Sequence, residues 1–200
     1  MRRLIYIPMV HTVADMGSEA ENLKGLYIAR NGEEEWLVRN RVVEKFWDEI
    51  EKRVFSMELD FSRVRIYQDG LPVSGKELQI MKEVAAQGSR NYRIVQELVE
   101  KGAALEGTED PRLLLAEYRA VKIIAAVRDE AARQRANVAF ALEAQEILKA
   151  RDAFVGQRID QTLQDGETGL LFMGLLHQVE QYLPSDIQVE YLVHRLPLSP

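Results

Sequence analysis

The chain has 200 residues, of which 46% are hydrophobic and 29% are charged, and its formal net charge is −6. This size suits a single domain with a real core, and no apolar run approaches the roughly 20 residues that cross a bilayer. The net negative charge argues against a general nucleic-acid binder, which needs a basic surface. Without any cysteine, disulfides and thiolate chemistry are excluded, and we expect a cytoplasmic protein.

The first predicted element is a strand over residues 4–10, because a continuous apolar run is typical of a strand buried in a parallel sheet. The charged start of the chain resembles that of a signal peptide, but its apolar stretch is short and contains Pro8, so we favour a strand. Residues 11–35 are polar and predict a loop followed by a short helix from Ser18. Apolar side chains at helical spacing then predict a helix over 33–57.

Strands and helices continue to alternate in the middle of the chain. Residues 64–67 predict a short strand, which the turn signal Gln68-Asp69-Gly70 ends. Residues 76–101 predict helix with an interruption near Gly88, and a minimal strand over 103–105 follows.

The segment 111–164 predicts helix along nearly its whole length, because it lacks internal proline and is rich in strong helix formers. It is too long for one helix in a small domain, so we expect at least two helices. The break is expected within 128–137 or around Gly156. The segment would cover a cleft or form the face of a homodimer, and the sequence does not choose between these options.

The C-terminal part predicts a second buried strand over 170–174, a helix over 178–183 and a final strand over 187–193. The complete order of elements is that of a mainly parallel, open α/β sheet of about five strands with flanking helices. We therefore predict one α/β domain over residues 1–200.

Polar side chains follow each of the first four predicted strands. His11 ends the first strand, Asp69 the second and His177 the fourth, while Glu106 and Asp110 follow the third. Ligand sites of parallel α/β sheets lie beyond the carboxyl ends of the strands, so we expect these groups to share one edge. Each also has a structural interpretation: a hydrogen-bonded loop histidine, a turn at Asp69, or a helix N-cap at Asp110.

This set of residues allows a limited range of chemistry. Histidine exchanges protons near neutral pH, and a carboxylate can orient it or activate water. His11 and His177 with a carboxylate would also hold a divalent metal with an open position, although no H-x-x-x-H spacing supports one. The G-x-S-x-G, Walker A and G-x-G-x-x-G motifs are absent from the sequence. The cofactor stays unassigned, and the expected ligand is a small molecule or a peptide.

The stretch from Arg151-Asp152 to Gly174-Leu175-Leu176-His177 resembles the TraB/PrgY–Tiki–ChaN–erythromycin esterase superfamily. In that group a helix with an Arg-Asp or Arg-Asn pair precedes a strand ending in G-x-x-H, and the N-terminal strand ends in a second G-x-x-H. Here the N-terminal motif is Pro8-Met9-Val10-His11, which keeps the histidine and lacks the glycine. Many members also carry a glutamate after the second strand, where this chain has Asp69.

The resemblance implies a cleft formed by both histidines, an acidic residue and an arginine, in a superfamily of metal-dependent peptidases and a metal-independent esterase. We therefore expect a hydrolase-like site for ester or peptide bonds. His11 and His177 would be general bases or metal ligands, Glu106 or Asp69 would assist, and Arg151 would stabilise an anionic intermediate. The alternative is a non-catalytic ligand-binding or scaffold protein with the same fold. Arg151 has an alternative of its own, as a surface charge on a helix rich in charged residues.

Overall fold

A parallel sheet of five strands forms the centre of the computed structural model, which describes residues 1–10, 20–127 and 129–193. The strand order is β3-β2-β4-β1-β5, and every adjacent pair is parallel. The strands are β1 (Arg2–Met9), β2 (Val64–Gln68), β3 (Ala104–Glu106), β4 (Thr168–Gly174) and β5 (Ile187–Tyr191). The predicted α/β class with a parallel sheet of about five strands is confirmed.

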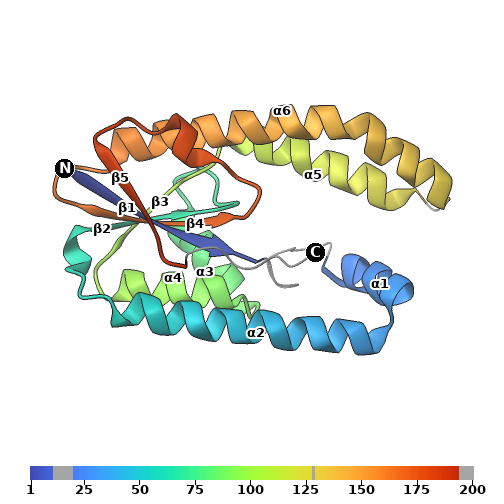
Figure 1. The fold of residues 1–200 in the computed structure, drawn as a ribbon, viewed down its shortest axis with the longest axis horizontal. Helices are drawn as coiled ribbons and strands as arrows, with labels where there is room; N and C mark the ends of the chain where they lie inside the picture. Colours follow the sequence, from blue (N-terminus) through green and yellow to red (C-terminus); the bar gives the residue numbers. More distant parts are fainter. Residues whose placement is uncertain (11–19, 128, 194–200) are drawn as a thin grey trace.

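Helices cover both faces of the sheet (Figure 1). Six α-helices and two short 3-10 helices are found in the described ranges. The 3-10 helix over Phe61–Arg63 is not predicted from the sequence, and the bounds of the others agree with predicted elements to within a few residues. They are α1 (Ala20–Asn31), α2 (Glu33–Ser56), η2 (Phe61–Arg63), α3 (Glu77–Ala86), α4 (Arg90–Glu100), α5 (Pro111–Ala126), α6 (Glu130–Thr162) and η3 (Val179–Tyr182). No helix in the described part of the chain is long and apolar enough to cross a membrane.

The protein has two hydrophobic cores, one on each face of the sheet, because the side chains of each strand point to the two faces in turn. On β1, Ile5 and Ile7 pack into the core formed with α2, α3 and α4. Leu4 and Tyr6 belong to the other core, which is formed with α6 and η3. Successive side chains of a strand point to opposite faces, so the continuous apolar run of β1 serves both layers.

The strand order brings the carboxyl ends of β1, β4 and β2 together. Met9 is paired with Gly174, and Gln68 is paired with Phe172. Asp69, directly after β2, donates its backbone N–H to the carbonyl oxygen of Phe172 at 2.9 Å. The ends of three strands that are distant in sequence therefore lie side by side at one edge of the sheet, and we call this surface the floor.

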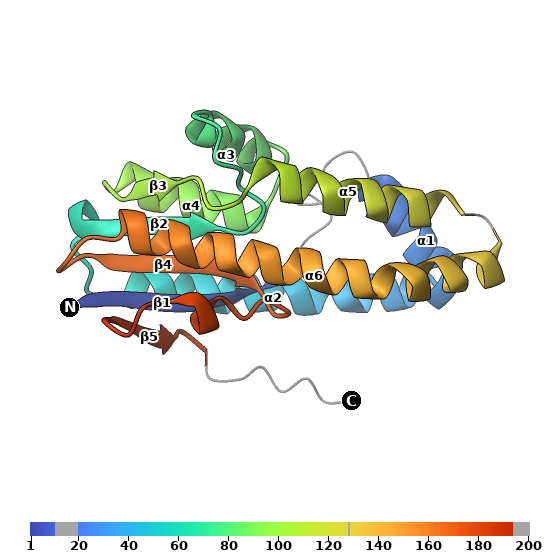
Figure 2. The ribbon, with the colours of Figure 1, turned by 90° about the horizontal axis from the view of Figure 1, so that it is seen from above.

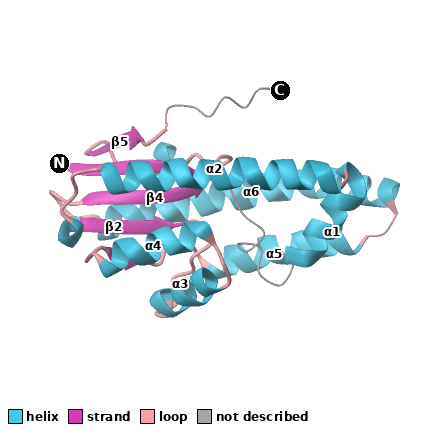
Figure 3. Ribbon diagram, turned by 90° about the horizontal axis from the view of Figure 1, so that it is seen from below, coloured by secondary structure: helices cyan, strands magenta, loops and turns pink. Residues whose placement is uncertain are grey.

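Long helices extend beyond this floor. The helices α5 and α6 on one face of the sheet and α2 on the other face all continue past the same end of the sheet (Figures 1, 2 and 3). The outer parts of α5 and α6 expose Ile123, Val138 and Leu142. Such exposed apolar side chains are compatible with the predicted cap or dimer face over 111–164, and both roles stay predictions.

The break in the long helical segment occurs between Ala126 and Glu130, at the start of the range predicted from the sequence. No break occurs at Gly156, which lies within α6. A Cβ atom at Gly156 would lie 2.7 Å from the Cβ atom of Tyr182 and 3.0 Å from its carbonyl oxygen. Gly156 is thus required for the close approach of η3 to α6, and not for ending a helix.

We predict that Gly156→Ala lowers the free energy of unfolding by about 1–2 kcal/mol, because overpacking against the η3 backbone outweighs the gain in helix propensity. Gly25→Ala is the matched control, since a Cβ there meets nothing within 4 Å. It should stabilise the protein by about 0.5–1 kcal/mol. Urea unfolding measures both, and equal stabilisation by the two substitutions would contradict this packing.

Candidate active site

A pocket of about 470 Å³ lies beyond the carboxyl ends of β1, β2 and β4, between the two helical layers. Its floor includes Met9, Asp69, Gly174 and His177. The walls come from α2 on one side and from α5, α6 and the loop after β4 on the others. Their side chains are Arg39, Leu114, Glu117, Leu148, Arg151, Leu175 and Leu176.

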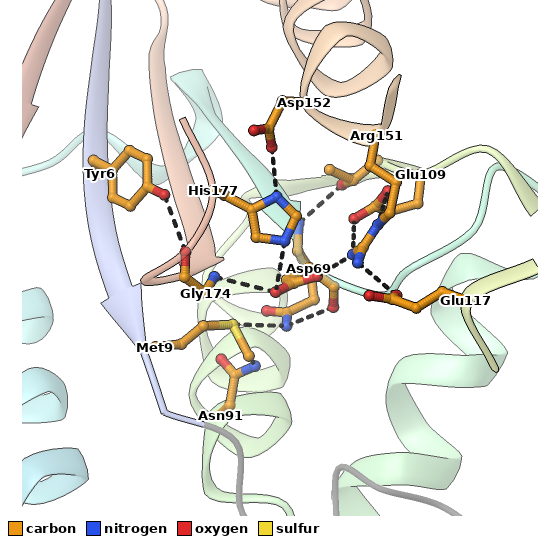
Figure 4. Close-up of polar contacts among 12 residues, drawn as sticks. Tyr6, Met9, Asp69, Asn91, Glu109, Glu117, Arg151, Asp152, Gly174 and His177 are labelled. Atoms are coloured by element: carbon orange, nitrogen blue, oxygen red, sulfur yellow. Dashed lines mark hydrogen bonds and ion pairs between the residues drawn. The ribbon is translucent and has the colours of Figure 1, made fainter. Parts of the chain in front are cut away.

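A buried Asp–His pair forms one side of the floor (Figure 4). The Oδ1 atom of Asp152 lies 2.5 Å from the Nδ1 atom of His177, and its Oδ2 atom accepts the backbone N–H of Gln178 at 2.9 Å. The backbone N–H of His177 donates to the carbonyl oxygen of Gly174 at 3.2 Å. The imidazole is therefore held in one orientation by α6 and by the turn after β4.

The other ring nitrogen of His177 faces a second carboxylate. Its Nε2 atom lies 3.7 Å from the Oδ2 atom of Asp69. That oxygen also accepts the backbone N–H of Gly174 at 3.1 Å, while Oδ1 accepts a hydrogen bond from Arg151 at 2.7 Å. Asp69 is thus fixed between β4 and α6, and its carboxylate stands beside His177 in the pocket.

The guanidinium of Arg151 is almost fully buried and binds three carboxylates (Figure 4). Besides Asp69, it donates to both oxygens of Glu109 at 2.6 and 3.1 Å, and to Glu117 at 2.6 Å. Burial works to lower the pKa of Arg151, but the hydrogen bond to Glu109 and the three negative charges outweigh it and raise that pKa. Arg151 therefore stays cationic and connects three segments of the chain.

Glu109 is fully buried because its loop is fastened to the loop after β2. The backbone N–H groups of Thr108 and Glu109 both donate to the carbonyl oxygen of Leu71 at 3.0 Å, and Val73 donates to that of Glu109 at 2.9 Å. Burial raises the pKa of Glu109, the charge of Asp69 adds to this, and the bond to Arg151 opposes it. A carboxyl group is thus kept beneath the pocket floor at a considerable electrostatic cost.

The cluster as a whole is acidic. Four carboxylates, those of Asp69, Glu109, Glu117 and Asp152, surround one guanidinium and one imidazole. Three of these carboxylates are buried, and only Glu117 is substantially exposed to solvent. The floor of the pocket is therefore electronegative and unsuited to a bound anion.

Two buried amides lie beside the floor, next to Met9. The amide nitrogens of Gln68 and Asn91 lie 3.6 and 3.8 Å from the Sδ atom of Met9. In the part of the chain that the structure describes, Gln68 Oε1 and Asn91 Oδ1 accept no hydrogen bond. Buried unsatisfied oxygens cost stability, so their presence at this edge is compatible with a functional site.

The structure brings together three of the five residues predicted from the sequence: Asp69, Arg151 and His177. Glu106 lies apart from the pocket, where it pairs with Arg65 and with Arg158, the latter at 3.6 Å. His11 falls outside the described residues, so its predicted roles as base and metal ligand stay predictions.

Sequence reasoning did not single out Glu109, Glu117 or the contact of Asp152 with His177. The Arg-Asp pair of the sequence contains Asp152, but no sequence pattern identifies His177 as its partner. Asp110, which the sequence places after the third strand, is the N-cap of α5 and accepts the backbone N–H of Arg112 at 2.7 Å. The sequence does offer a signal for Glu109: two acidic residues, Glu109 and Asp110, precede Pro111. A helix N-cap uses only one carboxylate, so the other is available for a different contact.

The described residues do not by themselves complete a metal site. No group of three or more His, Asp or Glu side chains among them is arranged to hold an ion, and Nδ1 of His177 is already bound to Asp152. A divalent metal therefore stays a prediction that depends on His11.

Comparisons with protein-family models, curated proteins and solved structures find no match to this chain. The site must therefore be interpreted from its own geometry. The contacts of Arg151, Asp152 and His177 determine which atoms face the pocket.

We predict that Arg151→Met destabilises the protein by about 3–5 kcal/mol, because it leaves Asp69 and Glu109 buried without their cation. Glu109→Gln should cost clearly less, since Arg151 keeps two carboxylates and burial already disfavours the charge of Glu109. Urea unfolding of both variants at neutral pH makes the comparison. A larger loss in Glu109→Gln than in Arg151→Met would contradict the central position of the guanidinium.

Proposed function

We propose that this chain is a hydrolase of ester or peptide bonds in a small molecule or a peptide, with His177 as its general base. The observation that carries the proposal is the contact of 2.5 Å between Asp152 Oδ1 and His177 Nδ1. It turns the Nε2 atom toward the pocket, beside Asp69. A base oriented by a buried carboxylate is a recurrent arrangement in hydrolytic sites.

In the proposed reaction, Nδ1–H donates to Asp152 and Nε2 accepts a proton from a water molecule. The oxygen of that water bonds to the carbonyl carbon of the substrate, forming a tetrahedral intermediate. His177 then returns the proton to the leaving alcohol or amine as its bond to carbon breaks. General base catalysis of this kind contributes about 10²–10⁴-fold to a rate.

Asp69 and Arg151 have supporting roles in this proposal. Asp69, whose carboxylate is 3.7 Å from Nε2, would hold the attacking water from the other side. Arg151 would position Asp69, because its guanidinium is already bound to three carboxylates. Its predicted contact with an anionic intermediate would require it to release the exposed Glu117.

The superfamily resemblance belongs to the same proposal. The Arg-Asp pair at Arg151 and Asp152 and the final histidine of the G-x-x-H motif are the residues that meet around this pocket. We propose that the chain is a distant member of the TraB/PrgY–Tiki–ChaN–erythromycin esterase superfamily. His11 and a divalent metal would add to the chemistry, and no step above depends on either.

A non-catalytic binding pocket is the second candidate. It is favoured by the position of the imidazole between the carboxylates of Asp152 and Asp69. If His177 carries two protons there, it is an ion-pair partner of both acids and has no lone pair for a base. The pocket would then bind a small molecule without changing it.

Substitution of the pair separates these candidates. His177→Gln should reduce kcat/KM for p-nitrophenyl esters or fluorogenic peptides by roughly 100-fold or more, and Asp152→Asn should reduce it by roughly 10-fold or more. Glu143→Gln, an exposed site on the same helix, is the control and should leave the rate unchanged. Wild-type turnover that survives in both variants, with circular dichroism showing an intact fold, would disprove the role of the pair.

A further inference from the structure

Two arginines line the pocket, and they differ in whether carboxylates neutralise their charge. Arg151 is almost fully buried and bound to three carboxylates. Arg39 lines the wall contributed by α2, and within the described ranges it forms no ion pair. The contact found for it there is with an aromatic ring: its guanidinium carbon lies 5.0 Å from the centroid of Tyr27. Arg39 is therefore a cation of the pocket that no described carboxylate neutralises.

The aromatic contact places the guanidinium of Arg39. The ring of Tyr27 packs edge to face on Trp36, at 5.4 Å between centroids and 61°, and Trp36 is buried in α2. Stacking on an aromatic face leaves the N–H groups at the edge of a guanidinium free to donate. Arg39 thus presents planar donors to the pocket from a supported position.

The charges of the pocket are divided between its two sides. Asp69 lines the floor, and next to the floor the carboxylates of Asp152 and Glu109 are bound to His177 and Arg151. A negatively charged group of a ligand would be repelled there and attracted to Arg39. The ligand is thereby oriented, with its anionic end toward α2 and its other end toward His177.

The side chains between these two sides are mostly apolar, and the carboxylate of Glu117 among them is bound to Arg151. Met9 lies on the floor, Leu114 and Leu148 come from α5 and α6, and Leu175 and Leu176 follow β4. Leu176 is 80% exposed, so apolar surface is available to a ligand. These leucine and methionine side chains accept a hydrocarbon segment of a ligand.

We propose that Arg39 is the anion subsite of this pocket, and that the substrate is an acyl compound with an apolar chain and a distal carboxylate. This inference rests on the proposed hydrolysis at His177, which would cleave the ester or amide at the opposite end of that chain. A carboxylate fits better than a phosphate, because one unpaired guanidinium in acidic surroundings balances a single negative charge. Hydrolysis places a new carboxylate beside Asp69, where repulsion favours release of the product.

Matched esters test the subsite. The substrates are p-nitrophenyl monoesters of adipate, suberate and sebacate, each compared with the same compound whose distal carboxylate is capped as a methyl ester. Wild-type protein should hydrolyse at least one free acid with a kcat/KM roughly 10-fold above that of its capped form. Arg39→Gln should remove this preference, because it should lower kcat/KM for the free acid by roughly 10-fold and that for the capped ester, which offers no distal carboxylate to Arg39, by much less.

Arg41→Gln is the control, since Arg41 is an exposed arginine of the same helix outside the pocket lining. It should keep the preference for the free acids. A preference that Arg39→Gln does not alter, or that Arg41→Gln reduces equally, would overturn the subsite.

Calorimetry with unesterified suberate and its monomethyl ester separates this inference from the proposed hydrolysis. If no ester is turned over but suberate binds with an affinity that Arg39→Gln lowers roughly 10-fold, the subsite is supported and the hydrolase proposal fails. If esters are turned over and neither binding nor turnover depends on Arg39, the subsite is wrong and the hydrolase proposal is untouched.

Discussion

The guanidinium of Arg151 is the interaction on which the arrangement of the pocket depends. It extends from α6 and binds Asp69 after β2, Glu109 in the loop before α5 and Glu117 on α5. Without this cation, the two buried carboxylates would repel each other across a region of low dielectric. The same bonds connect the helical layer to the strand ends. Arg151 therefore both fixes the position of the floor and offsets part of the negative charge of the carboxylates around it.

Two adjacent residues of α6 bind different parts of the site. Arg151 binds the carboxylates at the end of β2 and in the loop after β3, whereas Asp152 binds His177 after β4. The helix thereby sets the distance between Asp69 and the imidazole. An Arg-Asp pair on one helix is thus a physical means of aligning an acid and a histidine that come from the ends of different strands.

Much of the fold could be predicted from the sequence, because the strong signals were local. The apolar runs at 4–10 and 170–174 gave two central strands and the parallel class. The insertion of β4 between β1 and β2 could not be predicted, since order in a sheet depends on packing between distant segments. Gly156 shows the same limit. A glycine within a helical pattern either ends a helix or allows a close contact, and only the approach of Tyr182 shows that the second applies.

The site was predictable in location more than in detail. Asp69 and His177 follow strands, and the carboxyl ends of parallel strands meet at one edge. The sequence does not indicate that Glu109 is turned into the cluster while Glu106 pairs with Arg65, because backbone hydrogen bonds of the loop decide it. Arg151 was expected at the site, but its three carboxylate partners come from segments whose contacts no sequence pattern specifies.

Nitrogen NMR of the histidine rings tests the central claim most directly, with the His177 signals assigned through their loss in His177→Gln. In the neutral ring, Nδ1 should carry the proton, far downfield because of its short bond to Asp152, and Nε2 should be unprotonated. The downfield proton should disappear in Asp152→Asn. A neutral ring protonated at Nε2, unaffected by that substitution, would contradict the account.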